Sequence, residues 1–204
     1  MSERHFRFKR KQNSKSLQTS TRTPTAAFVI GLILTAAVAA ATAMDSNEVS
    51  PKMSSSTAIS ALIDGLKVSD LRDSFNELHN GHRHEAIDIM RPHGTPVHAV
   101  IRGTIRRIFH SRAGGNTIYE FDDNSEYCYY YAHLDKYAGH LYEGEHVSKG
   151  DVLGYVGSSG DAAPNAPHLH FAIFRVGADK FWWKGIPIDP YPILVHSIDN
   201  KPST

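Results

Sequence analysis

The sequence of residues 167–174 reads PHLHFAIF and has the alternation of a β-strand with one buried face. Side chains two positions apart lie on the same face of a strand, so His168 and His170 point the same way. The opposite face is apolar and consists of Leu169, Phe171 and Ile173. This segment therefore predicts a strand that packs one face on a core and presents two imidazoles together on the other.

Short apolar runs, broken by glycine and proline about every ten residues, surround this strand. They lie at residues 95–101, 104–109, 116–121, 127–131, 152–156 and 168–176. This spacing predicts a mainly β fold, a compact and mostly antiparallel domain that we expect over residues 69–195. The pattern contains no long helix, and we expect residues 196–204 to form a tail.

A second histidine-containing stretch, GHRHEAIDI, occupies residues 81–89. His84 and Asp88 are four positions apart, so they share a face on either a strand or a helix. An imidazole nitrogen and a carboxylate oxygen are normal ligands of zinc. The stretch is not an HExxH motif, because Asp88 stands where the second histidine would be. His82 is a competing ligand candidate.

A third stretch places His133 after the aromatic run 127–131. A single histidine of this kind is more often a surface or hydrogen-bonded core residue than a ligand. The pair His84/Asp88 and the two histidines of the strand nevertheless supply enough ligands for a three-ligand zinc site. Such a site keeps an open position for water and lowers the pKa of that water to about 7. The combination predicts hydrolytic chemistry.

Composition limits the alternatives. The 204 residues are 41% hydrophobic and 21% charged, as in ordinary globular proteins. Cys128 is the only cysteine, which excludes an internal disulfide framework and a cysteine-based zinc site. The net charge of +1 argues against a nucleic-acid partner, but it conceals an asymmetry: residues 1–25 carry +6 and the remainder −5.

Residues 26–44, AAFVIGLILTAAVAAATAM, contain no charged side chain. As a helix they would span roughly 28 Å, enough for the hydrocarbon core of a membrane. The positive-inside rule then keeps the basic tail, residues 1–25, cytoplasmic and places the acidic domain across the membrane in the cell envelope. We expect an uncleaved transmembrane anchor, with cleavage of a signal peptide after Ala43 as the alternative. Residues 45–68 read as a Ser-rich linker with a short helix at 57–66.

The histidine motifs also match a known family. The ordered set His84-x-x-x-Asp88, Tyr131-Ala132-His133 and His168-Leu169-His170 resembles the lysostaphin/LytM-type zinc metalloendopeptidases, which cut peptidoglycan cross-links. The segments GTPV at 94–97, VSKG at 147–150 and GYVGSSG at 154–160 agree with the same family.

The resemblance implies an antiparallel β-sheet core with a groove over the metal. It also implies that His84, Asp88 and His170 bind Zn²⁺, and that His133 and His168 are unliganded catalytic histidines. One departure is Ala86, where the family commonly has glycine. Its methyl group would narrow the groove or shift the loop, but it removes no ligand.

The function expected from these motifs is zinc-dependent hydrolysis of peptide bonds in peptidoglycan cross-links, with stem peptides as substrates. His133 or His168 would accept a proton from the zinc-activated water and return one to the leaving amine. One alternative is a non-catalytic regulator that activates a cell-wall amidase, although family members with that role typically have lost metal ligands. Another is a peptidase of ordinary proteins, which would share the same site.

Overall fold

The computed structural model describes residues 59, 62–79, 81–181 and 183–200. Strands dominate these residues, with one short 3₁₀ helix near their start and one α-helix at their end. In chain order the elements are η1 (Val68–Asp70), β1 (Leu78–His79), β2 (His82–Arg83), β3 (Ile87–Met90), β4 (Pro96–His98), β5 (Gly103–Ser111), β6 (Gly115–Asp122), β7 (Tyr127–Tyr137), β8 (His146–Val147), β9 (Val152–Val156), β10 (His168–Val176), β11 (Gly185–Ile188) and α1 (Pro190–Asp199).

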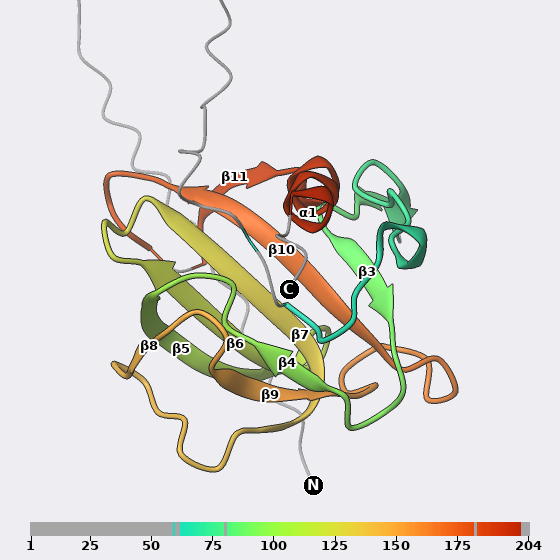
Figure 1. Ribbon diagram of the computed structural model, residues 1–204. Helices are drawn as coiled ribbons and strands as arrows, with labels where there is room; N and C mark the ends of the chain where they lie inside the picture. Colours follow the sequence, from blue (N-terminus) through green and yellow to red (C-terminus); the bar gives the residue numbers. More distant parts are fainter. Residues whose placement is uncertain (1–58, 60–61, 80, 182, 201–204) are drawn as a thin grey trace, which may run out of the picture. The chain divides into compact units, whose positions relative to one another are not determined.

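Nine of these strands form one antiparallel sheet, and β1 and β2 form a separate hairpin (Figure 1). The sheet runs in the order β11-β10-β7-β6-β5-β8, with β3 paired to β10, and β9 paired to β7 and β4. Strand β10 lies inside the sheet: β7 covers one edge, while β3 and β11 share the other. The mainly β, antiparallel fold expected from the sequence is therefore confirmed, and each of the six apolar runs overlaps a strand.

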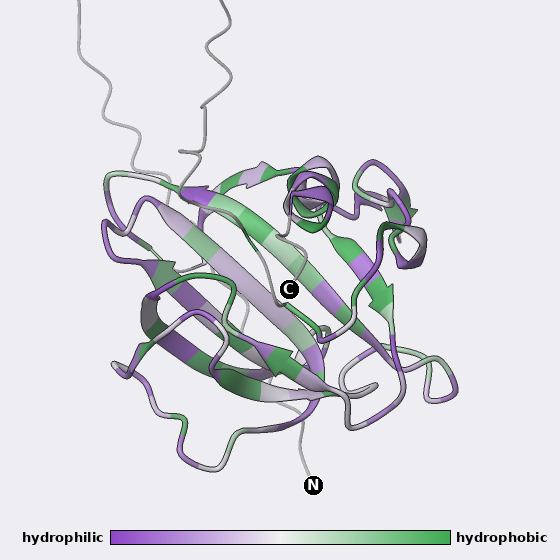
Figure 2. Ribbon diagram, viewed as in Figure 1, coloured by the Kyte–Doolittle hydropathy of each residue, from purple (hydrophilic) through white to green (hydrophobic). Residues whose placement is uncertain are grey.

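The core is built on the apolar face of β10. Leu169, Phe171 and Ile173 are completely buried, as are the side chains of β3 and β7 that pack beside them. Figure 2 shows the resulting alternation of hydrophobic and hydrophilic bands along these strands. Each fully buried side chain of this size contributes about 1.5–3 kcal/mol. The histidines of β10 stay partly exposed on the other face, as the alternation predicts.

The start of the domain differs from the expected linker with a short helix. The described residues of this stretch, Ile59 and 62–66, form bends and a turn rather than a helix. Ile59, Leu62 and Ile63 are instead buried in the core, and the Leu62 carbonyl accepts a hydrogen bond from the backbone of His98 on β4. Their spacing resembles that of a helix, but docking against the sheet determines their conformation.

The end of the domain also differs, because the expected boundary at residue 195 falls inside helix α1. Two prolines lie near the start of this helix, and for this reason the sequence pattern does not predict it. Proline is nevertheless tolerated in the first turn, where no backbone N–H is needed. Asp189 caps the helix by accepting a hydrogen bond from the Tyr191 backbone. Leu194 and Ser197 are buried, so the helix belongs to the folded domain.

Among the described residues, no helix is both long and apolar enough to cross a membrane. The basic tail 1–25 and the apolar segment 26–44 lie outside those residues, as does most of the segment 45–68. The transmembrane helix and its alternative, a cleaved signal peptide, therefore remain predictions.

Candidate metal centre

Three side chains from distant parts of the sequence converge above the sheet. Nε2 of His84 lies 3.1 Å from Oδ1 of Asp88 and 3.0 Å from Nδ1 of His170. The third side of this triangle, from His170 Nδ1 to Asp88 Oδ1, measures 3.1 Å. In the described part of the chain, these residues form the one cluster of histidine, cysteine or acidic side chains suited to a metal ion.

The sheet brings two of these residues together. In the antiparallel ladder between β3 and β10, Asp88 lies directly opposite His170. His84 approaches from the turn after β2, where its backbone N–H donates to the Glu77 carbonyl and Glu85 adopts a positive φ of 54°. A left-handed residue at this point redirects the chain between the hairpin and β3.

The donor set fits zinc. Two imidazole nitrogens and one carboxylate oxygen leave an open fourth position, as in catalytic zinc sites. In a regular tetrahedron with bonds of about 2.0–2.1 Å, ligand atoms lie roughly 3.4 Å apart. The observed triangle is only a few tenths of an ångström tighter. Nδ1 of His84 lies 3.2 Å from the Ser74 carbonyl, which can only accept, so Nδ1 carries the proton and Nε2 is available for a metal.

Two further histidines border the triangle. The rings of His133 on β7 and His168 on β10 lie 4.8 Å apart, and the His133 ring lies 5.6 Å from that of His170. Nδ1 of His133 donates to the Ser159 carbonyl, and Nδ1 of His168 donates to the Ala166 carbonyl. In the neutral tautomer that these bonds select, Nε2 of each ring is the acceptor nitrogen.

The position of His133 depends on a close contact between two turns. His133 has a positive φ of 60°, and Ser159 holds its ring. Gly160, with a φ of +79°, packs so tightly that a Cβ would lie 2.1 Å from the Ala113 carbonyl. Glycine is therefore required where the loop before β10 meets the turn before β6.

The electrostatic environment separates the roles of these residues. Burial raises the pKa of Asp88, but hydrogen bonds from His170 and His84 outweigh this and hold it well below its usual range. Burial lowers the pKa of His84, but the hydrogen bond to Asp88 reverses the direction and raises it. Burial lowers the pKa of His133 and of His170. His133 is thus neutral at neutral pH, as a proton acceptor must be.

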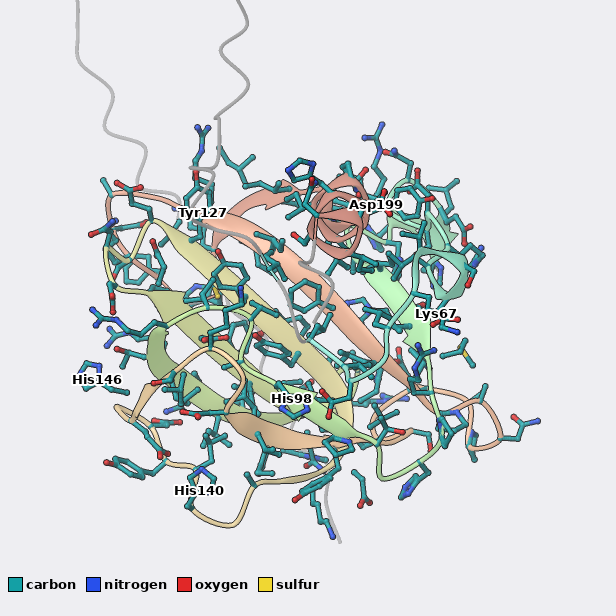
Figure 3. All side chains as sticks on the ribbon, viewed as in Figure 1. Lys67, His98, Tyr127, His140, His146 and Asp199 are labelled. Carbon is teal, nitrogen blue, oxygen red and sulfur yellow. The ribbon has the colours of Figure 1, made fainter. Side chains whose placement is uncertain are left out.

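All five predicted site residues line one groove of about 500 Å³. His82, the competing ligand candidate, lines the groove but lies outside the metal cluster. Ala86 is completely buried and does not line the groove, so its methyl group does not narrow it. Other histidines lie elsewhere: Figure 3 marks His98 on β4, His140 after β7 and His146 on β8.

Sequence reasoning missed the groups that orient this site. The carbonyls of Ser74, Ser159 and Ala166 fix three histidine rings, but no side-chain pattern signals a backbone acceptor. The aromatic run 127–131 lies on strand β7, as its pattern predicts, and Tyr129 and Tyr131 are core residues. Tyr130 lies between them and lines the groove, which the alternation of that strand could have indicated.

Comparison with known families matches residues 82–190 to peptidase family M23. A curated relative, the L-Ala–D-Glu endopeptidase of Bacillus subtilis (strain 168), is 35% identical over 116 residues. These residues cover 54% of this chain and 34% of the relative, so the chain spans about a third of the relative's length.

Solved structures show the same similarity. The catalytic domain of the antimicrobial peptidase lysostaphin from Staphylococcus simulans is 29% identical, with a TM-score of 0.51, and the match covers 62% of this chain and 94% of that domain. A putative glycyl-glycine endopeptidase lytM from Ruminococcus gnavus ATCC 29149 is 30% identical, with a TM-score of 0.55, and the match covers 63% and 54% of the two chains.

Proposed function

Because the chain belongs to peptidase family M23, we propose that it is a zinc-dependent endopeptidase that hydrolyses peptide bonds of peptidoglycan cross-links. The resemblance to lysostaphin/LytM-type peptidases is confirmed, and it rests on the family match together with structural neighbours at about 30% identity. The observation that carries the proposal is the triangle of His84, Asp88 and His170 in a groove beside two more histidines.

In this proposal His84, Asp88 and His170 are the metal ligands. When bound, zinc would polarise the scissile carbonyl as a Lewis acid and lower the pKa of a water. The three side chains line the groove, and the carbonyl of Ser74 keeps His84 in the tautomer that leaves Nε2 available.

The catalytic proton transfer falls to the two histidines outside the triangle. We assign His133 as the general base, because burial lowers its pKa and its Nε2 is free to accept. The protonated imidazole then donates to the leaving amine. His168 lines the same groove, with Nε2 3.8 Å from Oδ1 of Asp88, and is the second catalytic histidine of the proposal.

The relatives support the proposed substrate class. The curated relative is an L-Ala–D-Glu endopeptidase and one structural neighbour is a putative glycyl-glycine endopeptidase, so both names describe peptide-bond cleavage. Peptidoglycan stem peptides are the proposed substrates here. Five intact site residues support an enzyme over a regulator of an amidase, because a regulator needs neither ligands nor a base.

We also propose that the chain acts in the cell envelope. The apolar segment 26–44 would anchor the chain, and the basic tail 1–25 would stay cytoplasmic. The peptidase domain would then face the extracytoplasmic side, where peptidoglycan lies. N-terminal sequencing of the extracted protein separates the two possible forms, since a chain starting at Met44 means cleavage after Ala43.

The test of the enzymatic proposal uses the purified full chain with one equivalent of zinc and cross-linked muropeptide dimers. We expect loss of the dimers by chromatography, abolished in His170→Ala. His140→Ala is the matched control, because His140 is exposed and does not line the groove. Intact dimers together with stimulation of an amidase would support the regulator instead. Cleavage of unrelated proteins at the same rate would support a general peptidase.

A further inference from the structure

The groove contains two charged side chains that the proposed chemistry does not use. Arg83 lies on β2 directly before the candidate ligand His84, and Asp161 lies on the loop between β9 and β10. Both side chains are exposed and line the same cavity as the five site residues. They carry opposite charges and come from different parts of the fold.

Arg83 is held at the His84 end of the groove. It pairs with Leu78 in the β1–β2 hairpin, and the neighbouring pair links His79 with His82. The His79 ring stacks on that of His84, with centroids 4.4 Å apart, so the hairpin is fixed beside the metal triangle.

The guanidinium of Arg83 lines the groove and forms no ion pair with any residue that the structure describes. Some of the other arginines do bind acids of this chain: Arg72 binds Glu77, Arg91 binds Asp70 and Arg102 binds Asp123. Arg83 has no acidic partner among the residues that the structure describes. A guanidinium presents a planar fork of donors that matches a carboxylate in two parallel hydrogen bonds.

Asp161 is held at the His133 end. Its backbone N–H donates to the Ala113 carbonyl at 2.9 Å, and it follows Ser159 and Gly160, which position His133. Asp161 and His133 line the same groove, and the Ser159 carbonyl that holds the His133 ring is two residues from Asp161. In the described part of the chain, this carboxylate forms no ion pair.

We propose that the groove selects a substrate segment with a free carboxylate, bound by Arg83 near His84, and a free amino group, bound by Asp161 near His133. This inference rests on the proposed peptidase function and names the charge pattern of its substrate. Hydrolysis of a neutral peptide would require neither side chain. A groove with separated charges also fixes which way a peptide lies across the metal triangle.

The test compares pairs of peptides with the zinc-loaded full chain. One pair differs only in whether the carboxylate nearest the cleaved bond is free or amidated, and the other in whether the amino group is free or acetylated. We expect Arg83→Gln to lower kcat/KM about fivefold for the free carboxylate, as for an exposed ion pair, and to leave the amide unchanged. Asp161→Asn should lower kcat/KM by a similar factor for the peptide with the free amino group and leave kcat/KM for the acetylated peptide unchanged.

The matched controls are Arg106→Gln and Asp199→Asn, which remove exposed charges outside the groove and should change neither pair. Equal losses on both members of a pair, or no loss, would overturn the inference. Binding of the same peptides, measured by calorimetry, distinguishes failure of this inference from failure of the proposed peptidase function. If the chain hydrolyses none of the peptides and still binds the free-carboxylate peptide through Arg83, the proposed peptidase function fails and the charge selection stands. If the chain binds all of the peptides equally, the charge selection fails.

Discussion

His170 and Asp88 lie directly opposite each other in the β3–β10 ladder, with Nδ1 and Oδ1 3.1 Å apart. The register of the sheet therefore brings together two of the three candidate metal ligands. A slip of one residue would move Asp88 to the apolar face, because side chains alternate along a strand. The alternating core residues of β3 and β10 thus specify the site as well as the fold.

Asp88→Asn should separate metal binding from folding. The amide is nearly the same size, but it lacks the negative charge that faces both imidazoles. We expect zinc affinity to fall at least about 100-fold, a loss at least as large as that for removing a group that orients a ligand. Competition with a zinc chelator measures this. An unchanged affinity would remove Asp88 from the ligand set.

Gly160→Ala should displace His133 without removing a ligand. The new Cβ would meet the Ala113 carbonyl, and φ is positive, so we expect the free energy of unfolding to fall by about 2 kcal/mol or more. The Ser159 carbonyl should shift away from His133, lowering kcat while zinc content stays at one equivalent. Gly139→Ala is the control, because a Cβ there has nothing within 4 Å. Equal behaviour of the two variants would contradict this account of the loop.

Glu120 should make the stability of the domain depend on pH. Burial raises the pKa of Glu120 to about 8, against a hydrogen bond from Tyr131 that lowers it. Between the ordinary pKa of a glutamate and 8, the folded state holds a proton that the unfolded state has released. The free energy of unfolding should therefore decrease as the pH rises through this window, and level off above 8.

Glu120→Gln removes this titration and keeps an oxygen that can accept from Tyr131. We expect the variant to be more stable than the wild type at pH 8, and the two to converge toward pH 4. Urea unfolding at a series of pH values gives the comparison. A wild-type slope that persists in the variant would assign the pH dependence to other groups.

A chain that ends at residue 195 should be less stable than one that ends at residue 200. The shorter chain loses the last turn of α1, including buried Ser197, whose hydroxyl donates to the Ile193 carbonyl. We expect its melting temperature to fall by several degrees, since about 1 kcal/mol shifts a domain of this size by roughly 2–8 °C. Equal melting temperatures would place the end of the folded domain near residue 195, as the sequence pattern predicts.

The strands could be predicted from the sequence because they follow local alternation, and the same alternation predicts the common face of His168 and His170. The roles of the five site residues rest on the family resemblance and stay predictions. The pattern of PHLHFAIF alone places His168 and His170 on one face and three core residues on the other. Features that depend on tertiary contacts could not be predicted. Ile59, Leu62 and Ile63 have helical spacing but dock on the sheet, and two prolines obscure α1. The positions of the carbonyls that orient the histidines depend on strand register and turn geometry, which no side-chain pattern reveals.

The central claim is that the triangle of His84, Asp88 and His170 holds the metal that hydrolyses peptide bonds. Its most direct test is the rate of muropeptide dimer cleavage by the metal-free full chain as zinc is titrated in. The rate should start near zero, rise in proportion to added zinc and reach a plateau at one equivalent. Full cleavage before any zinc is added, or no cleavage at any zinc level, would contradict the claim.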